Sequence, residues 1–448
     1  MSVKRMWCCV AVMVLAVGVV GRAEASEPLT VDFLARYFGD CILDEVGWYE
    51  RTFGGLTPRQ KDSYVEMGAW LLQDVGGIVR EWERLEPFAG GVTIEREAFG
   101  VDCSPGQVDS HWRHLLALGV GSVRLTVGYG GVEGVETVLQ AAEIEPLVKL
   151  VQPREEYADL ERWRAVLRDA FGGLSPRVKY FEIGTCPNRI KWSGYETLYD
   201  YAEAARVARE VAKEFPEVRL VGPATQDFEP YWTAAVLRPF DGFDVLSDHL
   251  YVDRSGEPES AEEGIFDLVG KARMFKAIGR LHGIEQFWST QFNWERSGVE
   301  GAQYEGVHVP AETQANYVIR YYLLGLASGM MDRAYWYVLE SPTVGLLVGP
   351  GVKGSSYDAF AFLARTLSGA RFERRWTTPE GVYVLEFTKA GGRFLVGWTA
   401  DGGSYSLAVR RGELRDKGGK ILGTVADEVT LGPSPVYVFL EQADRVGR

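Results

Sequence analysis

The chain has 448 residues, of which 46% are apolar and 25% are charged, and its formal net charge is −14. This acidity argues against nucleic acid or an anionic membrane surface as a partner, because both need a basic patch on the protein. The 13 Trp, 21 Tyr and 21 Phe exclude a disordered chain and indicate a sizeable globular protein.

Residues 1–25 have the pattern of a cleavable export signal. Lys4 and Arg5 precede an uncharged apolar run from Trp7 to Val20, and Ala23-Glu24-Ala25 supplies small residues for a cleavage site. The run is shorter than the about 20 residues that a membrane-spanning helix needs. We therefore expect a signal peptide and a mature protein that is secreted or periplasmic, with no membrane anchor.

The mature chain has an odd number of cysteines. Cys8 and Cys9 lie inside the signal, which leaves Cys41, Cys103 and Cys186. At least one thiol must then be free or paired with another molecule. A Cys41–Cys103 or a Cys103–Cys186 bridge is possible, and the sequence does not choose between them. No CxxC or HExxH pattern occurs, so we expect neither a metal nor another cofactor.

Residues 26–90 are predicted to form a helical N-terminal segment. Leu29 to Tyr49 and Asp62 to Leu85 carry apolar residues at helical spacing, and Gly54, Gly55 and Pro58 separate the two stretches. No residue pattern there points to chemistry, and we expect a packing role.

Residues 91–370 alternate between short β-rich runs and helical stretches. The predicted strands are Val92–Val101, Ser122–Val127, Glu145–Val151, Val178–Ile183, Arg219–Gly222, Phe243–Ser247, Gln286–Thr290 and Ala334–Val338. Eight strands separated by helices match a (β/α)₈ TIM barrel in number and length. A doubly wound open sheet is the alternative, but it would normally carry a Gly-rich phosphate loop after its first strand, and Phe99 to Cys103 is not such a loop.

Residues 371–448 carry a different pattern, with short alternating strands separated by Gly-rich turns. The predicted strands are Tyr383–Thr388, Phe394–Thr399, Tyr405–Val409, Lys420–Val425 and Val436–Leu440. They predict a C-terminal all-β, sandwich-like domain.

The carboxyl ends of the barrel strands should carry the chemistry, because the active site of such barrels lies there. The polar and aromatic residues at or near those ends are Arg124, Thr185, Cys186, Asn188, Trp192, Trp232, Asp248, His249, Tyr251, Gln291, Asn293, Trp294 and Trp336.

Several of these segments resemble the motifs of clan A glycoside hydrolases, which are retaining (β/α)₈ enzymes. Residues 178–194, followed by Val221-Gly222-Pro223-Ala224, are similar to the fourth-strand motif E-I-x-N-E-P-N and the fifth-strand V-G-P-A. His249 and Tyr251 match the sixth-strand H-x-Y, and Thr290 to Trp294 match the seventh-strand T-E-x-N-W. The resemblance covers about residues 92–440 and implies a glycosidase-like barrel that takes carbohydrate or a glycoconjugate.

The chain departs from this family at both catalytic positions. The resemblance places Cys186 at the general acid/base, where the family has Glu, and Gln291 at the nucleophile, where the family also has Glu. Thr185 stands where the family has the Asn that binds the sugar 2-hydroxyl. A retaining glycosidase needs two carboxyl groups about 5–5.5 Å apart, and a thiol and an amide do not supply them.

Three hypotheses follow for the function. The first is a barrel that binds carbohydrate without ordinary retaining hydrolysis, through Arg124, Thr185, Asn188, Trp192, Asp248, His249, Tyr251, Asn293, Trp294 and Trp336. The second is an active glycosidase with relocated carboxylates, for which Asp102, Asp248, Glu295 and Glu340 are within reach of the strand ends and Asp248 is preferred. We expect Glu182, which lies deeper in the barrel, to pair with a buried arginine such as Arg124. The third is a thiol-dependent hydrolase with Cys186 as nucleophile and His249 as base.

Overall fold

The computed structural model describes residues 29–104, 108–128, 143–175, 177–252, 256–300 and 307–441. The predicted signal peptide, residues 1–25, lies outside the described residues. Among the helices that are described, none is long and apolar enough to cross a membrane.

Eight parallel strands close into a barrel, which confirms the predicted fold and rules out the doubly wound sheet. The strands are β2 (Phe99–Cys103), β3 (Ser122–Val127), β4 (Glu145–Leu150), β5 (Tyr180–Ile183), β6 (Arg219–Gln226), β7 (Val245–His249), β8 (Phe287–Phe292) and β9 (Arg333–Trp336). Each strand pairs with the next, and β2 pairs with β9 to close the ring. Nearly every strand residue is buried, as expected for parallel strands with side chains on one face and helices on the other.

Helices cover the outside of the barrel. They are α4 (Val108–Leu118), α6 (Leu160–Leu174), α8 (Leu198–Ala212), α9 (Pro230–Leu237), α10 (Leu268–Leu281), α11 (Ala311–Ala327) and α12 (Ser355–Leu367), with the short α7 (Ile190–Ser193) after β5. A separate cluster of buried side chains fills the barrel interior near the amino ends of the strands. It consists of Leu147, Tyr180, Val221, Val245, Trp288 and Tyr335. This apolar plug leaves the opposite end of the barrel, at the carboxyl ends of the strands, as the place where an active site is expected.

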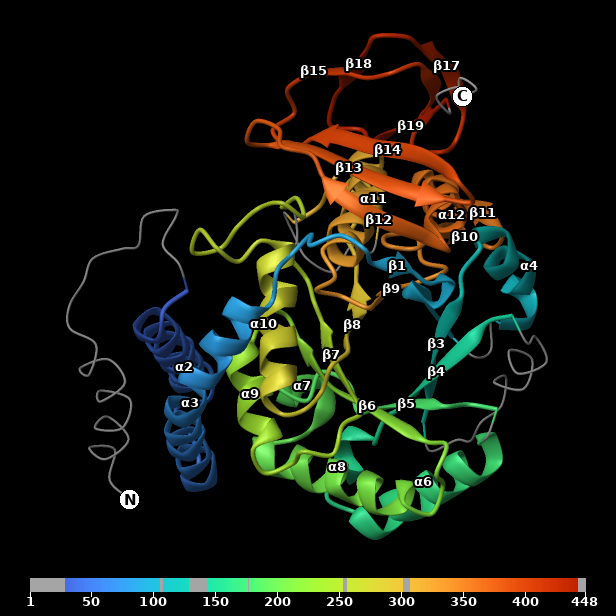
Figure 1. The fold of residues 1–448 in the computed structure, drawn as a ribbon. Coiled ribbons are helices and arrows are strands. Elements are labelled where there is room, and N and C mark those ends of the chain that lie inside the picture. The colour runs from blue at the N-terminus through green and yellow to red at the C-terminus, as the bar shows by residue number, and fades with distance from the viewer. Residues whose placement is uncertain are drawn as a thin grey trace.

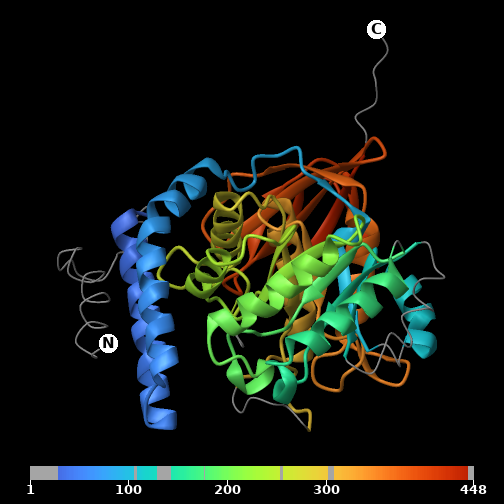
Figure 2. The same ribbon diagram turned by 90° about the horizontal axis from the view of Figure 1, so that it is seen from below.

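The N-terminal segment is a hairpin of two long helices, α2 (Val31–Phe53) and α3 (Pro58–Arg84). Thr30 caps α2, Gly54 ends it in the left-handed conformation, and Thr57 with Gln60 forms a capping box for α3. The hairpin stands beside α9 and α10, as Figures 1 and 2 show from two directions. The ion pair between Arg238 at the end of α9 and Asp74 of α3 fixes it there.

The first predicted strand, Val92–Val101, is in fact two strands that belong to different sheets. Thr93–Ile94 (β1) pairs with β12 (Ala370–Arg375) of the C-terminal region, and a 3₁₀ turn, η1 (Arg96–Ala98), separates it from the barrel strand β2. The charged run Glu95-Arg96-Glu97 interrupts the alternation of apolar and polar residues at this turn, and the prediction of one strand across it was wrong. The domain boundaries near residues 90 and 370 stay a prediction.

The C-terminal region contains a seven-stranded sheet of order β1-β12-β13-β14-β19-β16-β17 and a two-stranded sheet of β15 and β18. The strands are β13 (Val382–Lys389), β14 (Gly392–Thr399), β15 (Tyr405–Ala408), β16 (Gly412–Arg415), β17 (Ile421–Val425), β18 (Glu428–Leu431) and β19 (Val436–Leu440). A second apolar cluster, which includes Val384, Leu395, Leu407 and Leu431, lies between the two sheets and makes the arrangement sandwich-like. Figure 1 shows these sheets over α11 and α12.

The remaining strands, β10 (Leu347–Gly349) and β11 (Val352–Lys353), form a small hairpin before α12. Several contacts join the C-terminal sheet to the barrel. The indole N–H of Trp398 on β14 donates to Oε1 of Glu259 at 2.7 Å, and Glu259 also pairs with Arg320 of α11. Nζ of Lys389 on β13 donates to the Arg365 carbonyl of α12 at 2.7 Å.

Candidate functional site

Arg124 on β3 is the centre of the polar network inside the barrel mouth. Its side chain is fully buried, and it donates to Oδ2 of Asp102 at 2.7 Å and to Oε2 of Glu182 at 2.7 Å. Burial would lower the pKa of Arg124, but the ion pairs with Glu182 and Asp102 raise it above its ordinary value. The expected pairing of Glu182 with Arg124 is therefore confirmed, and both carboxylates serve the same guanidinium.

Cys186 follows the end of β5 through a backbone turn in the left-handed region. Gly184 and Cys186 have φ angles of 78° and 47°, and the Cys186 N–H donates to the carbonyl of Ala224 at 3.0 Å. The Sγ atom lies 3.3 Å from Oε1 of Gln226 and 3.3 Å from Nδ1 of His249. Burial raises the pKa of this thiol to about 11, so the group is protonated at neutral pH.

His249, the last residue of β7, is held in one tautomer by its neighbours. Its Nε2 lies 3.0 Å from Nη2 of Arg124, and a guanidinium can only donate, so Nε2 is the acceptor. The ring proton is therefore on Nδ1, where it faces Oε1 of Gln226 at 3.1 Å. Burial, followed by the charges of Arg124 and Lys149, lowers the pKa of His249 well below its ordinary value, so the imidazole is neutral.

Gln291 on β8 reaches the same network from the other side of the mouth. Its Nε2 donates to the Tyr251 hydroxyl at 3.0 Å, and its Oε1 accepts from Nη1 of Arg124 at 3.3 Å. Cys186 and Gln291 are thus joined through two side chains, His249 and Arg124. The structure brings together the two positions that the sequence motifs singled out.

Asp248 lies apart from this group, although it is next to His249 in the chain. It contacts Thr225, whose hydroxyl in turn lies 2.9 Å from that of Thr233 on α9, so the carboxyl group points toward the helical layer. Its Oδ1 has no hydrogen-bond partner among the described residues. Burial raises the pKa of Asp248 well above its ordinary value.

Glu295 and Glu340 are each paired with a histidine. Glu295 lies 3.5 Å from His308, and Glu340 lies 2.8 Å from His111. Among the described residues, the side-chain partners of Arg124 are Asp102, Glu182, His249 and Gln291, so neither Glu295 nor Glu340 pairs with it.

The tryptophans near the strand ends fall into two groups. Trp294 and Trp336 are 2% and 0% exposed, and their indole N–H groups donate to the carbonyls of Gly256 and Val344. Trp232 is also buried and packs against Tyr201. Trp192 on α7 is different, because 43% of its surface is exposed.

Three of the predicted binding residues at the barrel mouth differ in their exposure to solvent. Thr185 and Asn293 are half-buried. Tyr251 is buried, and its hydroxyl accepts a hydrogen bond from Gln291. Solvent therefore reaches the rim of the mouth more readily than the Arg124 network beneath it.

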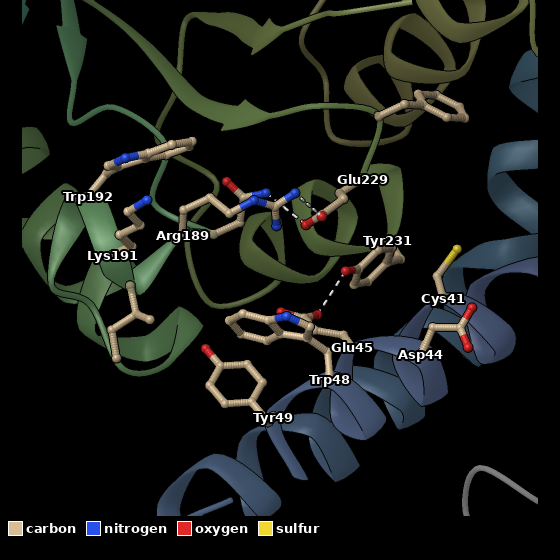
Figure 3. A pocket seen from close by; sticks show the side chains of 13 residues that line it. Cys41, Asp44, Glu45, Trp48, Tyr49, Arg189, Lys191, Trp192, Glu229 and Tyr231 are labelled. Atoms are coloured by element: carbon tan, nitrogen blue, oxygen red, sulfur yellow. Dashed lines mark hydrogen bonds and ion pairs between the residues drawn. The ribbon is translucent and has the colours of Figure 1, made fainter. Parts of the chain in front are cut away.

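Asn188 and Trp192 line a cavity of about 540 Å³ that opens beside the mouth, between the loops after β5 and β6 and helix α2 (Figure 3). Nδ2 of Asn188 donates to the Gln226 carbonyl at 3.0 Å and to Oε2 of Glu229 at 2.7 Å, and its Oδ1 accepts from the Gln226 N–H at 2.8 Å. The sequence did not indicate this cavity, because α2 carries no motif and is distant in the chain.

Cys41, Cys103 and Cys186 are free thiols, so neither of the two bridges that the sequence left open is present. Within the described ranges, no cluster of three or more His, Cys, Asp or Glu could hold a metal ion.

No protein-family profile and no curated protein matches this chain. Solved structures do match its fold. A family 39 glycoside hydrolase from the gut symbiont Bacteroides cellulosilyticus WH2 is 19% identical, with a TM-score of 0.63 over 78% of this chain and 82% of that chain. A GH39 β-xylosidase from Caulobacter crescentus is 15% identical, with a TM-score of 0.58 over 80% and 98%. A conserved exported protein from Bacteroides fragilis is 10% identical, with a TM-score of 0.57 over 79% and 98%.

These likenesses confirm the resemblance in fold that the strand-end motifs predicted. The chain shares its barrel fold with these solved glycoside hydrolase structures and has an additional β-sandwich-like region.

Proposed function

We propose that this chain is an exported carbohydrate-binding protein that uses a glycoside hydrolase-like barrel without carrying out retaining hydrolysis. The observation that carries the proposal is the state of Cys186 and Gln291: a protonated thiol and a neutral amide occupy the acid/base and nucleophile positions of the family motif. Retaining hydrolysis needs one ionised and one protonated carboxyl group about 5–5.5 Å apart.

The carboxylates near the mouth are poor replacements. Asp102 and Glu182 are both engaged by Arg124, and moving either would leave a buried charge without its partner. Asp248 is fully buried and directed at Thr225, away from Gln291. These positions speak against a glycosidase with relocated carboxylates.

The thiol-dependent route lacks a base. A general base must accept the nucleophile's proton, and Nδ1 of His249, the ring atom nearest Cys186, already carries a proton. The free lone pair is at Nε2 and is directed at Arg124. Both nitrogens are therefore committed, and the thiol hydrogen is instead offered to Oε1 of Gln226.

Carbohydrate as the ligand class is supported by the fold and by the partly exposed side chains around the mouth. The solved structures of the same fold include a β-xylosidase, and amide and hydroxyl groups at Thr185, Gln291 and Asn293 suit sugar hydroxyls. Export is supported by the signal pattern of residues 1–25 and by the likeness to an exported protein.

The test combines hydrolysis and binding on the same samples. Purified mature protein is incubated with p-nitrophenyl β-D-xyloside and β-D-glucoside, and binding of xylo- and cello-oligosaccharides is followed by calorimetry and on a glycan array. We expect binding without release of nitrophenol or reducing sugar. A Cys186→Glu/Gln291→Glu double variant that gains hydrolysis would show that the missing carboxyl groups disable the site. Turnover by the wild type that is lost in Asp248→Ala or Cys186→Ala would overturn the proposal.

A further inference from the structure

The cavity beside the barrel mouth has two walls from distant parts of the chain. Helix α2 supplies Glu45, Trp48 and Tyr49 on one side, and the loops after β5 and β6 supply the other, including Arg189, Trp192 and Glu229 (Figure 3). Its volume of about 540 Å³ lies in the range of small-molecule sites, about 300–1,000 Å³. Neither wall encloses the space alone, so the site exists only because the helical hairpin packs on the barrel.

Two tryptophans on opposite walls expose nearly half of their surface. Trp48 is 46% exposed on α2, and Trp192 is 43% exposed on α7. Both belong to the small set of large apolar side chains that are exposed to solvent among the described residues, whereas most of the other described tryptophans are buried. An exposed indole presents a flat apolar face with a polar N–H at its edge, which suits the apolar face and hydroxyl rim of a pyranose ring.

The polar groups of the cavity are held in place before any ligand arrives. Arg189 forms ion pairs with Glu229 and, at 3.4 Å, with Asp227, and Glu229 also accepts from Asn188 at 2.7 Å. Across the cavity, the Tyr231 hydroxyl donates to Oε2 of Glu45 at 2.8 Å. The side chains of Arg189 and Glu229 are 29% and 16% exposed, so they keep access to the cavity while they hold each other.

The charges of the lining nearly cancel. The lining contains two basic residues, Arg189 and Lys191, and three acidic residues, Asp44, Glu45 and Glu229. Burial, followed by the charge of Glu229, raises the pKa of Glu45 to about 7, which removes much of its charge near neutral pH. An ionic ligand would therefore find little net attraction, whereas a neutral ligand with many hydroxyl groups would find both donors and acceptors.

The hairpin wall is fixed rather than loosely placed. Arg238 pairs with Asp74 of α3, Arg59 of α3 pairs with Asp200 of α8, and Tyr231 bonds Glu45 of α2. A cavity whose walls are held in this way loses little entropy when it binds a ligand.

We infer that the cavity between α2 and the loops after β5 and β6 is a binding site for a neutral saccharide of one or two pyranose units. The sugar rings stack on Trp48 and Trp192, and their hydroxyl groups bond Arg189 and Glu229. The inference rests on the proposed function for its ligand class and names a place outside the barrel mouth where the saccharide binds.

The cavity is linked to the barrel mouth by hydrogen bonds. Asn188 lines the cavity and donates to Glu229. It also forms hydrogen bonds with the backbone N–H and carbonyl of Gln226. The side chain of Gln226 in turn contacts Cys186 and His249. Two residues, Asn188 and Gln226, therefore connect the cavity to Cys186.

The test measures binding of xylobiose, xylotriose, cellobiose and cellotriose to the full mature chain by calorimetry and by tryptophan fluorescence. We expect Trp48→Ala and Trp192→Ala each to weaken binding at least tenfold, because each removes one stacking surface. Leu72→Ala serves as the matched control, since Leu72 is 40% exposed on the same hairpin and does not line the cavity, and it should leave binding unchanged. Thr185→Ala and Gln291→Ala report on the barrel mouth in the same assay.

The outcomes separate this inference from the proposed function. Loss of binding in both tryptophan variants, with wild-type binding in the Leu72 variant, supports the cavity as a binding site. Loss confined to Thr185→Ala or Gln291→Ala overturns the cavity but keeps a carbohydrate-binding protein. Absence of binding in the wild type overturns the inference, and release of reducing sugar overturns the proposed function whichever tryptophan variant is used. Far-UV circular dichroism of each variant identifies any loss that comes from misfolding, and Trp48→Phe and Trp192→Phe, which keep a flat ring, should then restore part of the binding.

Discussion

The Sγ atom of Cys186 and the Nδ1 atom of His249 lie 3.3 Å apart, yet neither the thiol nor the imidazole is charged. Burial raises the pKa of the thiol to about 11 and lowers that of the imidazole well below its ordinary value. A close cysteine and histidine are often read as an activated nucleophile, but activation needs a thiolate beside an imidazolium or a base with a free lone pair. Arg124 prevents both, because it occupies Nε2 and disfavours a second positive charge.

The first prediction concerns the reactivity of this thiol. With a pKa of about 11, about one Cys186 side chain in a thousand is ionised at pH 8, and Cys41 and Cys103, whose pKa values burial raises to about 12, are ionised even less. We expect the native mature protein to react slowly with 5,5′-dithiobis(2-nitrobenzoate) at pH 8. In guanidinium chloride the same sample should react fast at all three thiols. A fast thiol in the native state, or only one thiol after denaturation, would contradict the free and protonated cysteines described above.

The second prediction concerns Arg124 and the free energy of unfolding. Replacing Arg124 by Met leaves Asp102 and Glu182 buried without their shared cation, which should cost about 3–5 kcal/mol. Arg164→Ala is the matched control, because it breaks an ion pair with Glu210 on the protein surface and should cost less than about 1 kcal/mol. Urea denaturation of both variants measures the difference. If Arg124→Met does not fold, Glu182→Gln tests the same point by removing one of the two charges, and equal losses for the buried and surface pairs would refute the central role of Arg124.

The barrel could be predicted from the sequence because each strand is a short run of apolar and β-branched residues between helical stretches. Ser122–Val127 was predicted with the bounds that the structure has, and the other barrel strands differ mainly at their ends. The split of the first predicted strand could not be foreseen, because pairing of Thr93 and Ile94 with Arg371 and Ala370 depends on the packing of two distant segments. Sequence periodicity records which face is buried, not which strand covers it.

The candidate site was predictable in part. The resemblance to the clan A glycoside hydrolase motifs singled out Cys186 and Gln291, and the structure joins them through His249 and Arg124. Asp248 was also singled out, but consecutive residues of a strand point to opposite faces, so His249 faces inward and Asp248 faces α9. The cavity at Trp48 and Trp192 was not predicted, since nothing in the two segments signals that they meet.

The third prediction concerns Glu45 and the dependence of stability on pH. Burial, followed by the charge of Glu229, raises the pKa of Glu45 from 4.5 to about 7, while hydrogen bonds from Tyr231 and Tyr64 and the charge of Arg189 oppose the shift. A carboxyl group with a raised pKa in the folded state binds its proton more tightly there than in the unfolded chain. Its contribution to stability is therefore complete below about pH 4.5 and is lost as the pH rises to about 7.

Glu45→Gln removes this titration and keeps the shape of the side chain. We expect the stability of the variant relative to wild type to rise between pH 4.5 and pH 7 by at most about 3 kcal/mol, the limit set by the shift in pKa. The measurement is the urea midpoint of both proteins across that pH range. A difference that does not change with pH would show that Glu45 titrates normally.

The fourth prediction concerns Gly100, which lets β2 and β9 close the barrel. A Cβ atom at Gly100 would lie 2.3 Å from Cδ1 of Tyr335, and Tyr335 is part of the apolar plug inside the barrel. Because the ring is fully buried, it cannot move aside without disturbing Trp288, which lies 6.3 Å from it between ring centroids. Gly100→Ala should therefore destabilise the protein by about 1–3 kcal/mol or more, as overpacked cores do.

The matched control for this variant is Gly173→Ala in α6. A Cβ atom there meets nothing within 4 Å, and alanine lowers the conformational entropy of the unfolded chain, so the change should stabilise the protein by up to about 1 kcal/mol. The same substitution thus has opposite signs at two positions, which thermal or urea unfolding can resolve. Tyr335→Leu in the Gly100→Ala background should recover part of the loss, because it removes the ring that the new methyl group meets. If Gly100→Ala is as stable as wild type, the ring of Tyr335 does not lie against β2, and the closure of the barrel by β2 and β9 must be built from other contacts.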